Sequence, residues 1–181
     1  MITSTEIIDY WFCEQVKKQW FNSTPELDQE ILQKYGQTWE LASLGDLDEW
    51  SMTPLGCLAL VIILDQFPLN MFRGDAKSFS TEQKSIEITL KAIENKFHKK
   101  MDENKLSFLF MPLMHSENIE DQNLSVELFT EFNLKANIRF AEHHQNLIAR
   151  FGRFPHRNSI LGRKSMDAEI KYLASKEAFT W

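Results

Sequence analysis

The run from Leu55 to Phe67 limits the possible folds more than any other part of this sequence. Its apolar side chains fall on all sides of a helix rather than along one stripe, and such a helix needs other elements around it. Thr53 and Pro54 before it are typical of a helix start. The uninterrupted apolar part ends at Leu64, about half of the ~20 residues that a membrane-spanning helix needs. We therefore predict a central buried helix that ends at Pro68.

Most of the remaining chain repeats apolar residues at helical spacing. Leu27, Ile31, Tyr35 and Trp39 recur every four residues, as on one face of an α-helix. We expect a short helix before Pro112 and another that begins at Ser116. No stretch alternates with a period of two, so we predict an all-α fold: a multi-helical antiparallel array of helical hairpins with short connections.

Composition and charge narrow the class of protein further. Apolar residues make up 43% of the chain, and few Pro or Gly divide it, so we predict a single all-helical domain over residues 1–181. A formal net charge of −6 disfavours binding to nucleic acids and docking on acidic membranes. Cys13 and Cys57 lack metal-binding spacing, and the first residues do not form a signal peptide. We expect a cytoplasmic protein without a cofactor or a metal.

Asp65 is the first candidate for a functional residue. It closes the expected central helix, where its carboxylate faces the negative end of the helix dipole among apolar neighbours. We therefore expect Asp65 to pair with an arginine, either Arg73 or one from the segment 153–163. The alternative is that this pair only fixes the turn.

A second candidate group surrounds an expected helix start. His115 precedes Ser116 and Glu117, and Asp121 follows four residues after Glu117, so that the two carboxylates would share one helical face. Two carboxylates beside a neutral histidine can hold a metal ion or position a water molecule. The alternative is a capped helix start without a function.

The third candidate group is a basic segment in an otherwise acidic chain. It holds Arg150, Arg153, His156, Arg157 and Arg163 within fourteen residues. Arginine binds carboxylate and phosphate groups through two parallel hydrogen bonds. These side chains either bind an anionic ligand or neutralise Asp65, Glu117 and Asp121 internally. We expect His144, which lies in register with Ile148, to be a core histidine instead.

Four stretches resemble a known bacterial family. They are WFNSTPELDQEI (20–31), LALVIILDQFPLNMFRG (58–74), FLFMPLMHSENIEDQ (108–122) and HQNLIARFGRFPHRNSILGR (144–163). In these stretches the chain resembles the bacterial domain-of-unknown-function family 924. This resemblance implies a multi-helical fold similar to tetratricopeptide repeats, without an established activity. The family's polar pattern covers Asp65, Gln66, Asn70, Arg73, Gly74, His115, Ser116, Glu117, Asp121, Gln122, His144, Arg153, His156, Arg157, Asn158 and Arg163.

The chain departs from the family pattern at three positions. Leu69 replaces a usual Arg, so that one basic contact near Asp65 is missing. Asn118 replaces a usual Asp. Met166 replaces the Thr of a capping box that ends at Glu169, and we expect Ser165 or Asp167 to cap that helix instead.

Three functions are compatible with these residues. The first is a tetratricopeptide-like binding module whose Arg/His-rich pocket holds an anionic small molecule or an acidic peptide. Its ligand-binding residues would be Asp65, Arg73, His115, Glu117, Arg153, His156, Arg157 and Arg163. The second is a hydrolase of an anionic small molecule, with catalytic candidates His115, Glu117, Asp121 and His156. The third is an ionic network that only locks the helices together. A binding site would require these side chains to meet, with at least one arginine free of internal carboxylates.

Overall fold

A helical segment through the middle of the molecule organises the fold. It consists of α4 (Pro54–Val61), a π-helical turn η2 (Ile62–Gln66) and α5 (Phe67–Met71). The structure, a computed structural model, describes residues 2–178. Every residue from 57 to 67 is at most 7% exposed, which confirms the predicted buried central helix. Pro54–Met71 is long and apolar enough to cross a membrane, but 83% of it is buried inside the protein, so packing explains its apolar character.

Pro68 does not end this helix, contrary to the prediction. Proline lacks an N–H, and its ring displaces the carbonyl four residues earlier, which here belongs to Leu64. The hydroxyl of Thr81 donates to that carbonyl at 2.6 Å, and the indole N–H of Trp39 donates to Thr81 Oγ1 at 3.3 Å. The wider π turn and this substitute donor let the helix continue to Met71.

Replacing Thr81 with valine should lower the free energy of unfolding by about 1–3 kcal/mol, since the Leu64 carbonyl would lose a buried donor. Urea unfolding of the two proteins measures this difference. Ser43→Ala removes an exposed hydroxyl that donates to a local backbone carbonyl and serves as the control. An equal midpoint for Thr81→Val and the wild type would contradict this role of the hydroxyl.

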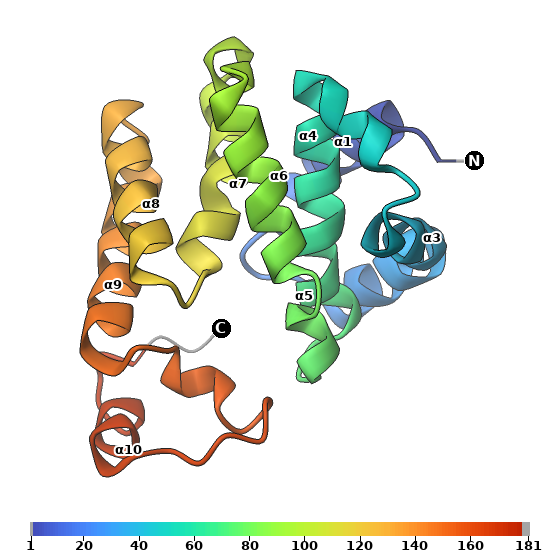
Figure 1. Cartoon of the computed structure of the whole chain (residues 1–181). Coiled ribbons are helices and arrows are strands. Elements are labelled where there is room, and N and C mark those ends of the chain that lie inside the picture. Colours follow the sequence, from blue (N-terminus) through green and yellow to red (C-terminus); the bar gives the residue numbers. More distant parts are fainter. Residues whose placement is uncertain (1, 179–181) are drawn as a thin grey trace.

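The other helices lie on either side of α4 (Figure 1). Residues 2–178 contain no strand, which fits the predicted all-α class. On one side, α1 packs against α4 and α3 against α5, whereas α6, α7, α8 and α9 follow one another on the other side. The further α-helices are α1 (Ser4–Trp11), α2 (Glu14–Lys17), α3 (Pro25–Leu44), α6 (Glu82–Glu94), α7 (Glu103–His115), α8 (Ile119–Glu131), α9 (Lys135–Phe151) and α10 (Asp167–Leu173). The short 3₁₀ turns are η1 (Asp48–Met52), η3 (Ala76–Phe79), η4 (Phe97–Lys100) and η5 (Pro155–Arg157).

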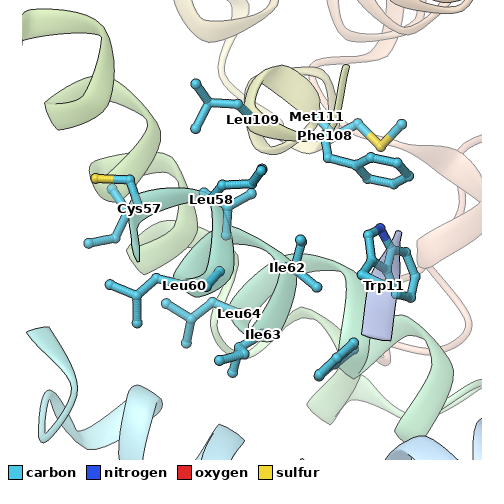
Figure 2. Close-up of a cluster of buried hydrophobic side chains, with 14 of the residues drawn as sticks. Trp11, Cys57, Leu58, Leu60, Ile62, Ile63, Leu64, Phe108, Leu109 and Met111 are labelled. Carbon is cyan, nitrogen blue, oxygen red and sulfur yellow. The ribbon is translucent and has the colours of Figure 1, made fainter. Parts of the chain in front are cut away.

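The main apolar core lies where α1, α4 and α7 meet. Figure 2 shows Leu58 and Ile62 between the side chains of Trp11 and Leu109. The rings of Trp11 and Phe108 meet edge to face, with centroids 5.5 Å apart, a favourable arrangement for aromatic pairs. This core fixes the end of α4 against α7 and so brings Asp65 toward the last turn of α7.

Helix α7 also continues through a proline. Pro112 lies inside it, and Thr89 on α6 donates to the Leu109 carbonyl at 2.9 Å. As a result His115 is the last residue of α7, whereas the sequence prediction placed it before a helix start. Asn118 rather than Ser116 caps α8, because its side chain accepts the Glu120 N–H at 2.8 Å.

The chain leaves the bundle at Gly152, which ends α9 in the left-handed conformation with φ 70°. Residues 152–166, which we call the strap, then cross the lower end of the molecule to α10 (Figure 1). A second, smaller apolar cluster, formed by Leu147, Ile148, Phe154 and Tyr172, joins this part to α9.

Candidate functional site

Asp65 pairs with a histidine instead of the arginine that the sequence predicted. The carboxylate is 5% exposed, and its two oxygens lie 2.9 and 3.1 Å from His115 Nδ1. Gln66 Nε2 also donates to it at 2.5 Å. The π turn places Asp65 against the end of α7, where the His115 side chain remains 14% exposed.

Arg73 cannot serve as that partner because it lies past the end of α5 and turns to α3. Its Nε donates to Asp28 Oδ2 at 2.8 Å, and Asn70 donates to the same carboxylate at 2.7 Å. This cluster fixes the start of α3 and is separate from Asp65. Arg73 therefore leaves the predicted ligand-binding set.

Arg157 links the strap to the bundle beside the Asp65–His115 pair. Its side chain is 8% exposed, and it donates to Glu82 at 2.8 Å and to the His115 carbonyl at 2.9 Å. The guanidinium lies between the rings of Phe79 and Phe154, 4.4 and 4.7 Å from their centroids. A position between two aromatic rings favours a cation. Arg157 is therefore held by two hydrogen-bond acceptors and by two aromatic rings.

Glu82 is a member of this network that the sequence analysis missed. It opens α6 and looks like an exposed residue of a polar first turn. Burial raises its pKa above the usual glutamate value, although Arg157 and His115 act in the opposite direction. Its role is evident only from its pairing with Arg157, which lies 75 residues further along the chain. No local sequence pattern predicts this pairing.

Glu117 receives the second arginine of the strap. Both terminal nitrogens of Arg163 donate to its carboxylate, at 2.6 and 2.9 Å, and the Phe154 N–H donates to it at 2.7 Å. Burial raises the pKa of Glu117, but the hydrogen bonds from Arg163 and Phe154 outweigh it and hold the pKa below the usual value. Glu117 thus binds the strap by both a side chain and the backbone.

Asp121 does not share a face with Glu117, because Glu117 precedes α8 and Asp121 lies in its first turn. Ser116 Oγ donates to Asp121 at 2.6 Å. Gln122, which is fully buried, donates to the carbonyls of Met114 and Ser116 at 2.7 Å. These contacts fix the connection between α7 and α8, so we assign Asp121 a local structural role.

Arg153 pairs within the C-terminal part of the chain. Its Nε and Nη2 donate to Glu169 at 2.6 and 2.8 Å. Asn158 and the Met166 N–H donate to the same carboxylate. The Arg153 hydrogen bonds are the main reason that the pKa of Glu169 falls to about 2.

Two histidines, His144 of α9 and His156 of the strap, contact Phe154 and are mostly neutral. His144 is 3% exposed and its Nδ1 lies 2.7 Å from the Phe140 carbonyl, which confirms the predicted core histidine; burial lowers its pKa to about 3. Burial and then the charge of Arg157 lower the pKa of His156 to about 4. Both rings lie against Phe154, with centroids 5.3 and 5.6 Å away.

The predicted site residues therefore converge in part. Asp65, His115, Glu117, Arg157 and Arg163 belong to one contiguous network. The expectation of a free arginine is wrong, since Arg73, Arg153, Arg157 and Arg163 each bind a carboxylate. In the part of the chain that the structure describes, no group of three or more His, Cys, Asp or Glu side chains is arranged to hold a metal ion.

Comparisons with known proteins agree with the predicted family and with the all-α fold. Residues 7–177 match the family described as bacterial proteins of unknown function (DUF924). The chain belongs to this family. A solved structure of a protein of unknown function from Agrobacterium tumefaciens is 30% identical, with a TM-score of 0.88, and the match covers 94% of this chain and 96% of that one. No curated protein matches the chain.

The departures of this DUF924 member have simple structural consequences. Asp65 has His115 and Gln66 as partners, so it needs no arginine at Leu69. Asn118 still caps α8, as an aspartate would. We expected Ser165 or Asp167 to cap α10, and this expectation was wrong. Met166 occupies the cap position, and its N–H donates to Glu169. Only the backbone half of the capping box is kept.

Proposed function

We propose that this chain is a tetratricopeptide-like helical binding module that binds an anionic small molecule or the carboxylate of an acidic peptide at His115. The observation that carries the proposal is the contact between a nearly fully buried Asp65 and His115 Nδ1. An ionised carboxylate only accepts hydrogen bonds, so Nδ1 carries a proton and the ring has a fixed orientation.

The other ring nitrogen is the group that remains for a ligand. Among residues 2–178, His115 Nε2 has no hydrogen-bond partner, and the side chain keeps 14% of its exposure. When both ring nitrogens carry a proton, the Nε2–H can donate to an anion. Arg157 and Arg163, the latter 23% exposed, belong to the same network but are paired with Glu82 and Glu117, so His115 is the group of this network that can bind an anion.

Titration of the ¹⁵N-labelled protein with phosphate, sulfate and short acidic peptides tests this proposal. We expect saturable shifts of the His115 ring resonances with at least one of these anions. His115→Gln should weaken binding about ten-fold, the usual size of a lost hydrogen bond between charged groups. Arg150→Ala, an exposed arginine outside the network, should bind like the wild type. The absence of any saturable shift would favour a network that only locks the helices.

The same pair also favours a second function, hydrolysis of an anionic small molecule. With Nδ1–H oriented by Asp65, a neutral His115 has its lone pair on Nε2, where it can take a proton from water. In this reaction His115 would be the general base and Arg163 would contact the substrate anion. Phosphate and carboxylate esters of small molecules distinguish the two functions, because a binding module leaves them intact. His115→Gln should then abolish any turnover without changing the fold measured by circular dichroism.

A further inference from the structure

The C-terminal part of the chain, residues 152–178, is attached to the bundle in an unusual way. Its apolar contacts with the bundle are those of Phe154 and Tyr172 with Leu147 and Ile148 of α9, in a small cluster that is separate from the main core. Its links to α6 and to the α7–α8 connection are polar. They are Arg157 with Glu82, Arg157 with the His115 carbonyl, Arg163 with Glu117, and the Phe154 N–H with Glu117.

Within itself, this part is well connected. The fully buried Glu169 gathers donors from Arg153, Asn158 and the backbone of Met166. The Arg163 N–H also donates to the Asn158 carbonyl at 2.7 Å. The strap and α10 therefore hold together by contacts that do not involve the rest of the bundle.

A glycine stands where this part joins α9. Gly152 has φ 70°, and a Cβ at its position would meet nothing within 4 Å. A left-handed glycine in open space absorbs changes of backbone angle at low cost. Segments with few buried apolar contacts and a hinge open at a lower free energy than the whole domain.

We infer that residues 152–178 open as a unit from the helical bundle while the bundle stays folded, and that this opening admits a ligand to His115. In the closed form Arg157 donates to the His115 carbonyl. Arg157 is also paired with Glu82, and Arg163 is paired with Glu117. In the open form both guanidinium groups leave these carboxylates and can contact an anion. The admission of a ligand rests on the proposed function, whereas the opening itself does not.

Native-state hydrogen exchange at fixed pH, with increasing urea below the unfolding transition, tests the opening. The amides of Phe154 and Arg163 report on the strap, and the amide of Ile62, which is fully buried in the central helix, reports on the bundle. We expect the strap amides to exchange faster than Ile62 and with a smaller dependence on urea. A common rate and a common urea dependence for all three amides would overturn the inference, because the whole chain would then open together.

Glu117→Gln sharpens this test, since it removes the charge that holds Arg163. The variant should speed exchange at Phe154 and Arg163 about ten-fold, the size expected for a hydrogen bond to a charged group, and leave Ile62 unchanged. The matched control is Asp48→Asn, which breaks the ion pair with Lys84 on the bundle and should leave the strap amides unchanged. Equal acceleration at Ile62 would also count against a separate unit. If the strap opens but no anion binds, the proposed function fails and the opening stands.

Discussion

Replacing Arg157 with alanine should lower the free energy of unfolding by about 3–5 kcal/mol, the cost of leaving one member of a buried ion pair alone. Glu82 would lose the cation 2.8 Å away, and the His115 carbonyl would lose a donor. Phe79 and Phe154 would also lose the guanidinium that packs between them. Urea unfolding followed by circular dichroism measures the change.

Two further variants make this result specific. Arg150→Ala removes an exposed arginine three residues before Arg153 and should change stability by no more than about 0.5 kcal/mol. Arg157→Ala combined with Glu82→Gln should recover part of the loss, because the uncompensated carboxylate is gone. A loss below about 1 kcal/mol for Arg157→Ala would mean that the pair is not a buried one.

The stability of the protein should fall steeply between pH 6.5 and pH 5, before most carboxylates titrate. His144 and His156 have folded-state pKa values of about 3 and about 4, below the value of 6.5 for an unperturbed histidine. The unfolded chain therefore binds protons that the folded chain excludes, so stability is complete above pH 6.5 and is lost as the pH falls toward the folded values. Each histidine should cost about 2 kcal/mol at pH 5.

Urea unfolding at several pH values checks this slope. His144→Leu should remove about half of the loss between pH 6.5 and pH 5, since leucine does not titrate. At lower pH, Glu117 and Glu169 add a further loss, because their folded-state pKa values are depressed. A slope that is the same in the wild type and in His144→Leu would show that this ring is protonated without cost.

Local patterns in the sequence were sufficient for the helices and the core, because caps and apolar spacing act over a few residues. Thr24 and Thr53 cap the helices that we expected, and Gly45 and Gly152 end theirs in left-handed conformations. Pro68 and Pro112 misled the prediction for one shared reason. Thr81, the cap of α6, donates to the displaced Leu64 carbonyl at 2.6 Å, and Thr89 of α6 donates at 2.9 Å to the Leu109 carbonyl, next to the Phe108 carbonyl that Pro112 displaces. No rule of local sequence contains these donors.

The members of the candidate site were predictable in part, but their pairing was not. From the sequence we predicted five of its members, which are Asp65, His115, Glu117, Arg157 and Arg163. We also predicted an arginine as the partner of Asp65, and we did not predict Glu82. The pairing depends on which side chains face one another in space. The two residues of a pair are 42 to 75 positions apart in the sequence. Because α7 continues past Pro112, His115 is the last residue of a helix. In this position His115, rather than an arginine, contacts Asp65.

The π turn at Ile62–Gln66 gives the central helix two different angular registers. A π turn holds one more residue than an α turn, and one residue of an α-helix corresponds to a rotation of about 100°. If α4 continued as an unbroken α-helix, the side chains of Phe67–Met71 would point in other directions around the helix axis. The π turn rotates them from those directions, whereas the side chains of Pro54–Val61 keep theirs. Winding the same residues as an unbroken α-helix, with none deleted, would rotate one half against the other. The arrangement of Asp65 toward α7 and of Asn70 toward α3 is thus a property of the number of residues in this turn as much as of their identity.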